Sequence, residues 1–143
     1  MNDTALEGLQ RTLAAEHAAI WVLSTLGGRA SALTDPGLRD ALAAAYDVHL
    51  QRRDQLRTLV AGAGGDPVAA EPAYRFPSPL GTATRIEAEA LRVERACATT
   101  YAALVTATVG RDRRWAVDAL IATAVGEVDF GGRPEALPGL AAD

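Results

Sequence analysis

The sequence contains no lysine: all 14 of its basic residues are arginines. It contains one cysteine, Cys97, which excludes an internal disulfide and a metal site built from several thiolates. Aromatic residues make up only 5% of the chain, whereas 31 residues are alanines. Small side chains with high helix propensity favour a core of closely packed helices over a sheet rich in β-branched and aromatic residues.

Long apolar runs and an excess of positive charge are also missing. No run reaches the about 18 residues that a membrane-spanning helix needs, and the first residues lack the basic and apolar regions of a secretory signal. The formal net charge of −4 argues against a nucleic-acid-binding surface. We therefore expect a cytoplasmic protein that binds neither membrane nor nucleic acid. Its 143 residues are enough for one domain with its own core.

Start and stop signals divide the chain into four expected helices. These helices span residues 4–27, 36–61, 82–109 and 112–128. Thr4 and Glu7 have the spacing of a capping box, and Asp35 before Pro36 is typical of an N-cap followed by a first helical proline. Asp112 is the expected cap of the fourth helix. The sequence therefore predicts an all-α protein.

The fourth helix has an apolar pattern of its own. Val117, Ile121, Val125 and Val128 recur at intervals of three or four residues. This spacing places them on one face of a helix, and a continuous apolar face normally points toward the core. We therefore expect these four side chains to be buried.

The lengths of the connections predict the topology. Short loops join the first helix to the second and the third to the fourth, so each pair is expected to form an antiparallel hairpin. Residues 63–81, with four prolines, cannot form a regular helix but can run the full length of the bundle at about 3.3 Å per residue. This favours a ferritin-like four-helix bundle with one long crossover over a surface loop that leaves an up-and-down topology unchanged. Residues 129–143 are expected to form an irregular tail.

Four polar side chains lie near the midpoints of the four expected helices. They are Glu16, His49, Glu94 and Asp118. Glu16 belongs to the same apolar series as Leu13 and Ile20, and His49 lies at the centre of the apolar face of its helix. Midpoints of antiparallel helices share one level, so these groups can meet in one layer.

A metal site is one interpretation of this layer. Bundles that hold two iron or manganese ions use a Glu from each of two helices and a Glu-x-x-His motif from each of the other two. Here Tyr46 stands three residues before His49, and Ile121 stands three residues after Asp118. The second carboxylate and the second histidine are therefore missing, and Glu16, His49, Glu94 and Asp118 are at most the ligands of one iron, manganese or zinc ion.

A metal-free ion network is the other interpretation. Arg53 is expected on the same face of its helix as His49, and Arg52 at the edge of that face. Either guanidinium offers a fixed cation that can pair with Glu16 or Glu94 in place of a metal. Ionised groups need such partners because desolvation costs several kcal/mol per ion. His17 lies away from the centre of its apolar face and is interpreted as a boundary residue. Cys97 is interpreted as a small core residue.

Several segments together resemble a known family. "LAAEHAAIWVLSTLGGR", "HLQRRDQL", the segment from Glu94 to Tyr101 with "YAALV", and "ALPGL" are similar to a ferritin-like domain family of unknown function found mainly in high-GC bacteria. The resemblance covers most of the chain. It implies a ferritin-like bundle and no established activity. The positions that match the motifs are Glu16, His17, His49, Arg52, Arg53, Asp54 and Tyr101.

Three functional hypotheses follow. The first is a non-enzymatic binding or structural protein without a cofactor, expected to form a homodimer, whose Glu/His/Arg layer fixes the register of the helices. A separate hypothesis is a ligand pocket between the helix pairs in which Arg52 or Arg53 holds a small anionic group. The alternative is an oxidoreductase with a single iron, manganese or zinc ion in a degenerate two-metal site.

Overall fold

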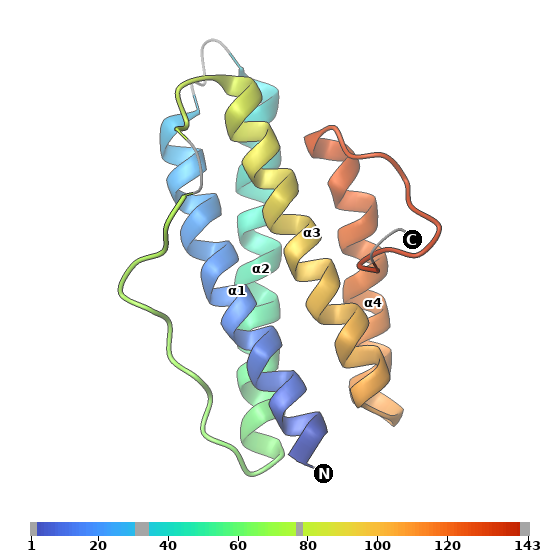
Figure 1. The fold of residues 1–143 in the computed structure, drawn as a ribbon. Coiled ribbons are helices and arrows are strands. Elements are labelled where there is room, and N and C mark those ends of the chain that lie inside the picture. The colour runs from blue at the N-terminus through green and yellow to red at the C-terminus, as the bar shows by residue number, and fades with distance from the viewer. Residues whose placement is uncertain (1–2, 31–34, 77–78, 141–143) are drawn as a thin grey trace.

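The computed structural model describes residues 3–30, 35–76 and 79–140. These residues form four α-helices, one short 3-10 helix and no strand, so the predicted all-α fold is confirmed (Figure 1). The elements are α1 (Asp3–Arg29), α2 (Pro36–Gly62), α3 (Ala83–Ala107), α4 (Gly110–Gly126) and η1 (Glu127–Phe130). None of the described helices combines the length and the apolar character that crossing a bilayer requires.

Side-chain caps define the beginnings of α2 and α3. Oδ1 of Asp35 accepts a hydrogen bond from the backbone N–H of Leu38 at 3.0 Å. The hydroxyl of Thr82 accepts one from the N–H of Arg85 at 3.2 Å. Each cap satisfies a backbone donor that has no partner within its helix.

The other helix ends differ from the expected ones. Thr4 lies inside α1, which begins at Asp3, and α3 ends at Ala107 rather than at residue 109. Gly110 adopts a φ of 60°, which glycine tolerates, so α4 begins there and Asp112 lies in its first turn instead of capping it. Residues 127–130 tighten into η1, which ends at Phe130 and is followed by Gly131 in the left-handed conformation.

The long connection between α2 and α3 runs along α1 from one end of the bundle to the other (Figure 1). Gln10 fixes its first part, because its side-chain amide donates to the carbonyl of Asp66 at 2.6 Å and accepts from the N–H of Val68 at 2.9 Å. Further along, the ring of Trp21 lies 5.8 Å from that of Tyr74 and 5.3 Å from that of Phe76. The connection is therefore packed against α1 by polar and aromatic contacts.

The apolar core consists of two clusters. One contains Leu9, Leu13, Leu56, Val60, Leu104 and Ala116. The other includes Val22, Leu23, Leu26, Leu42, Ile86 and Val93. Glu16 lies between Leu13 and Val22 on α1, and His49 lies between Leu42 and Leu56 on α2, so the polar side chains separate the two clusters.

The predicted inward face of α4 is wrong. Ala116, Ala119 and Thr123 are the buried residues of α4. Three members of the predicted face are exposed, with fractions of 59% for Ile121, 68% for Val125 and 52% for Val128. The small side chains let α4 approach α3 closely, and the larger branched ones point to solvent.

Candidate functional site

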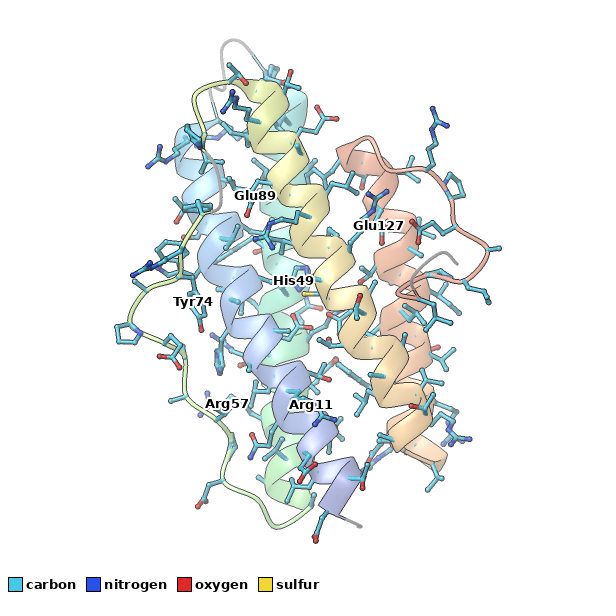
Figure 2. The ribbon with its side chains drawn as sticks, viewed as in Figure 1. Arg11, His49, Arg57, Tyr74, Glu89 and Glu127 are labelled. Carbon is cyan, nitrogen blue, oxygen red and sulfur yellow. The ribbon has the colours of Figure 1, made fainter. Side chains whose placement is uncertain are left out.

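Three helices bring Glu16, His49 and Glu94 together at mid-height of the bundle. Their exposed fractions are 0%, 1% and 4%. Nδ1 of His49 lies 2.6 Å from Oε2 of Glu16, and Nε2 lies 3.1 Å from Oε1 of Glu94. The imidazole thus bridges two buried carboxylates, one from α1 and one from α3. Figure 2 shows His49 near the middle of the bundle, whereas Tyr74 lies on the connection beside α1.

Arg52, one turn after His49 on α2, extends this group toward α4. Its Nη1 donates to the hydroxyl of Tyr101 at 3.1 Å and to that of Thr123 at 2.6 Å. Its Nη2 donates to the carbonyl of Ala119 at 3.3 Å. The hydroxyl of Tyr101 donates in turn to Oε1 of Glu16. We call Glu16, His49, Arg52, Glu94, Tyr101 and Thr123 the central layer.

The charges of the central layer balance. Burial alone lowers the pKa of His49, but hydrogen bonds to Glu16 and Glu94 and the charges of these carboxylates outweigh it and raise that pKa from 6.5 to about 9. His49 is therefore an imidazolium at neutral pH and donates from both nitrogens. The imidazolium and the Arg52 guanidinium balance the two carboxylates. No buried side-chain N or O atom in the described part of the chain lacks a hydrogen-bond partner.

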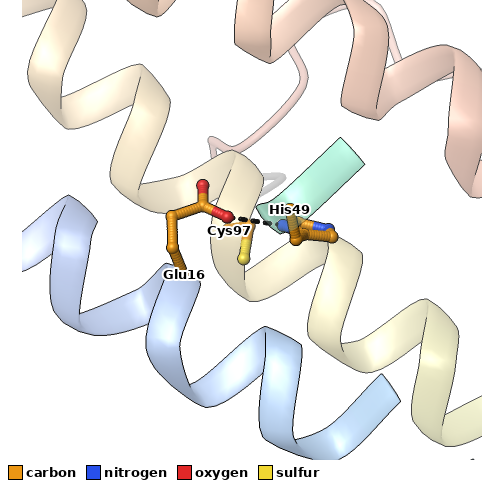
Figure 3. Close-up of side chains that lie close together, drawn as sticks. All are labelled: Glu16, His49 and Cys97. Carbon is orange, nitrogen blue, oxygen red and sulfur yellow. Dashed lines mark hydrogen bonds and ion pairs between the residues drawn. The ribbon is translucent and has the colours of Figure 1, made fainter. Parts of the chain in front are cut away.

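Cys97 lies beside the central layer. A carboxylate oxygen of Glu16, a ring nitrogen of His49 and the sulfur of Cys97 all lie within 4.8 Å of one another (Figure 3). Burial, followed by the negative charges of Glu16 and Glu94, raises the pKa of the Cys97 thiol well above its usual value. Burial likewise raises the pKa of Tyr101. Both groups are therefore neutral at physiological pH, and the thiol is not an activated nucleophile.

Three predicted site residues lie outside the central layer. Arg53 pairs with the neighbouring Asp54 at 2.9 Å, and the Asp54 side chain is 62% exposed. The Arg53 guanidinium holds the pKa of Asp54 below its usual value. Nε2 of His17 lies 3.0 Å from the carbonyl of Val68, so this histidine contacts the long connection. Of the two arginines considered from the sequence, Arg52 is the one in the layer.

Asp118 is not brought into the layer either. It is exposed on α4, and the buried polar residue that α4 contributes is Thr123. The periodicity of the larger apolar residues pointed to the wrong face of α4. The spacing of Ala116, Ala119 and Thr123 was the available signal for the correct one.

The residues present do not fit a two-metal centre. Tyr46, at the position of the second carboxylate, is partly buried and lines a cavity between α1 and α2. Ile121, at the position of the second histidine, faces solvent. A single ion remains compatible with the donor set, since Glu16, His49 and Cys97 offer one oxygen, one nitrogen and one sulfur within reach of one another.

A groove of about 290 Å³ lies between α2 and α4. Arg52, Asp118 and Trp115 are among its lining residues, together with the amide side chains of Gln51 and Gln55. The indole N–H of Trp115 donates to Oε1 of Gln55 at 2.7 Å, which links the two helices across the groove. Arg52 is only 7% exposed and forms no ion pair with a carboxylate among the described residues. The groove thus gives solvent access to one edge of the central layer.

Comparisons with known proteins identify relatives of the chain. A family model described as a domain of unknown function (DUF4439) matches residues 8–142. The crystal structure of a conserved hypothetical protein from Mycobacterium tuberculosis is similar to this chain, with 27% sequence identity and a TM-score of 0.83. The similarity covers 92% of this chain and 98% of that one. The search of curated proteins gave no match.

Proposed function

Since the chain belongs to the DUF4439 family, whose description assigns no activity, we propose its function from its own side chains. It is a non-enzymatic, ferritin-like binding protein in which His49 and Arg52 take the place that metal ions have in two-metal bundles. The observation that carries this proposal is the His49 imidazolium between Glu16 and Glu94, with both ring nitrogens engaged.

The charge balance supports a metal-free layer. A metal ligand must be a neutral imidazole, so His49 would have to release a proton whose pKa is about 9. At pH 7 this release costs about 3 kcal/mol before any metal binds. The Arg52 cation would then remain in the same layer and repel the incoming ion. The layer therefore fixes the register of the helices, and binding takes place elsewhere on the bundle.

The groove between α2 and α4 is the binding site in this proposal. Arg52 has hydrogen bonds only to neutral acceptors, so its positive charge can attract an anionic group from the groove. The Trp115 ring and the amides of Gln51 and Gln55 add an apolar surface and hydrogen-bonding groups. Asp118 on the same groove disfavours multiply charged anions. The proposed ligand is a small molecule with one carboxylate.

Elemental analysis tests the metal-free layer. The chain is purified without chelator, incubated with iron, manganese or zinc, desalted and measured by plasma mass spectrometry. We expect far less than one ion per chain for each metal. About one ion per chain that disappears in Glu16→Gln and His49→Gln, and persists in the matched control His17→Gln, would contradict the proposal.

A titration of the groove tests the ligand class. Acetate, propionate and phosphate are added to isotopically labelled protein, and backbone amide shifts are followed by NMR. We expect saturable shifts near Arg52 with the monocarboxylates and weaker ones with phosphate. Gln51→Glu should weaken the carboxylate shifts, because it adds a negative charge to the groove. Thr58→Glu adds the same charge on α2 outside the groove and should leave them unchanged; equal effects of the two variants would exclude the site.

The cluster of Glu16, His49 and Cys97 favours a second candidate function. These residues, with Glu94 as a further oxygen donor, would hold one iron, manganese or zinc ion, which would supply Lewis-acid or redox chemistry. Under this alternative Cys97→Ala also lowers metal content, whereas the metal-free proposal predicts the same low content in wild type and variant. The metal content of Cys97→Ala therefore separates the two functions.

A further inference from the structure

Helix α4 and the η1 turn that follows it carry a second apolar face, most of which is exposed in the part of the chain that the structure describes. Val117, Ile121, Val125 and Val128 follow one another at helical spacing, and the last three have exposed fractions of 59%, 68% and 52%. Single exposed apolar side chains are normal on a protein surface, but an ordered stripe at the period of a helix is typical of an interface. Val117 is half-buried and Val128 belongs to η1, and we call these four residues the outer stripe.

We propose that the outer stripe joins two copies of this chain, with α4 of one copy antiparallel to α4 of the other. The three members of the stripe that lie on α4 are symmetric about Ile121, because Val117 and Val125 each lie four residues from it, whereas the position symmetric to Val128 is Arg114. A twofold axis at Ile121 therefore places Ile121 against itself and Val117 against Val125 of the second copy. An isologous interface requires this kind of self-complementary pattern.

Charges at the two ends of the stripe favour the same arrangement. Arg114 stands seven residues before Ile121, and Asp129 stands eight residues after it, so an antiparallel copy places Asp129 next to the position opposite Arg114, which Val128 occupies. Both are exposed, and neither has an ion-pair partner in the part of the chain that the structure describes. Arginine near a helix N-terminus is unfavourable for its own helix, whereas the C-terminal end of an antiparallel helix attracts it. A second copy in this arrangement therefore brings opposite charges together at both ends of the stripe.

The expected dimer is weak and reversible. One pair of helices buries less area than the about 1,200–2,000 Å² of a standard stable interface. We therefore expect dissociation on dilution in the micromolar range. The dimer goes beyond the proposed function and does not depend on it, since the outer stripe faces away from the central layer and metal content does not affect the prediction.

Analytical ultracentrifugation over a concentration series tests the dimer. Wild type should sediment increasingly as a dimer as its concentration rises to a few hundred micromolar. Ile121→Glu should remain monomeric with unchanged helix content by circular dichroism. Val68→Glu is the matched control, since it places the same charge at an exposed apolar position on the long connection, and it should dimerise like wild type. A wild-type chain that stays monomeric, or an Ile121→Glu chain that still dimerises, overturns the proposal.

Two further variants test the antiparallel register. Ile121→Cys lies on the proposed twofold axis, so mild oxidation should link two chains through this residue, while Val68→Cys should give little linked product. The native Cys97 is buried and should not interfere. Arg114→Glu should weaken the dimer at least several-fold, and addition of Asp129→Arg to that variant should restore it. If the double variant is weaker than either single one, the antiparallel arrangement is wrong.

Discussion

Nδ1 of His49 lies 2.6 Å from Oε2 of Glu16, although 33 positions separate the two residues in the sequence. This contact joins α2 to α1 at the centre of the bundle, where both side chains are almost fully buried. A buried hydrogen bond between two charged groups has a strict geometry, so it fixes the height of one helix relative to the other.

The His49 imidazolium should make the stability of the protein depend on pH. Its pKa is about 9 in the folded chain, against 6.5 for an unperturbed histidine. Its contribution to the free energy of unfolding is therefore complete below pH 6.5 and is lost as the pH rises through about 9. The full contribution is about 3 kcal/mol. Urea unfolding between about pH 6 and pH 9.5 should show this decline.

The matched control for this pH dependence is His49→Gln, which should be less stable overall and should lack the decline. Both proteins are compared in a Cys97→Ala background, because the exposed thiol of the unfolded chain ionises near its ordinary pKa of 9.0 and would add a pH dependence of its own. Equal slopes in the two proteins would show that His49 is not the titrating group.

Removal of the Glu16 carboxylate should destabilise the fold. Glu16→Ala leaves Nδ1 of His49 and the Tyr101 hydroxyl without an acceptor, while Nε2 of His49 keeps its contact with Glu94, so we expect a loss of about 3–5 kcal/mol in the free energy of unfolding. Glu16→Gln keeps an acceptor oxygen and should lose less. Glu7→Ala removes an exposed carboxylate from the same helix and should change stability by less than about 1 kcal/mol. Chemical denaturation measures all three, and similar losses for Glu7→Ala and Glu16→Ala would contradict a buried ion network.

Adjacent arginines on α2 should differ in their contribution to stability. Arg52→Ala removes three hydrogen bonds and leaves buried acceptors on α3 and α4, so it should cost at least about 3 kcal/mol. Arg53→Ala removes a surface pair with Asp54 and should cost less than about 1 kcal/mol. Thermal unfolding of the two variants provides the comparison. A larger loss for Arg53→Ala would mean that the two side chains have been assigned to the wrong roles.

The Cys97 thiol should be unreactive in the native protein. It is 2% exposed, and burial raises its pKa, so both access and thiolate formation are suppressed. A colourimetric thiol reagent should label no group in native protein at pH 8 and one group per chain in denaturant. Fast labelling of the native chain would show an opening of the bundle at the central layer.

The N-terminal ends of α2 and α3 could be predicted from the sequence, because helix caps depend on residues close by in the sequence. Asp35 and Thr82 cap their helices through backbone groups three residues away. The same local signals predicted an α3 that ends two residues too late and an α4 that begins too late. The reason is Gly110, which adopts a φ of 60° that glycine tolerates and so begins α4. Periodicity also indicated that Glu16 and His49 lie on apolar faces, since each belongs to an apolar series at helical spacing.

The choice of partners needed the packed structure. The sequence pattern placed Arg53 on the face of His49 and Arg52 only at its edge, and this was wrong. The position of α4 makes Arg52 the buried cation, because it places Thr123 and the Ala119 carbonyl within reach of Arg52. The nearness of Cys97 to Glu16 and His49 likewise depends on how three helices pack. The exclusion of Asp118 depends on the rotation of α4 about its own axis.

Local patterns in the sequence were enough to predict the helical class, the approximate extent of each helix and the charged groups on the buried faces of α1, α2 and α3. The tertiary structure decided which charges meet, which cation lies between them and which face of α4 remains outside. The reason is physical: helix periodicity indicates that an apolar face is to be buried, but it does not indicate which element or which second chain buries it. On α4 small residues pack inside the bundle, and the larger apolar face is left for a contact that the chain does not make with itself.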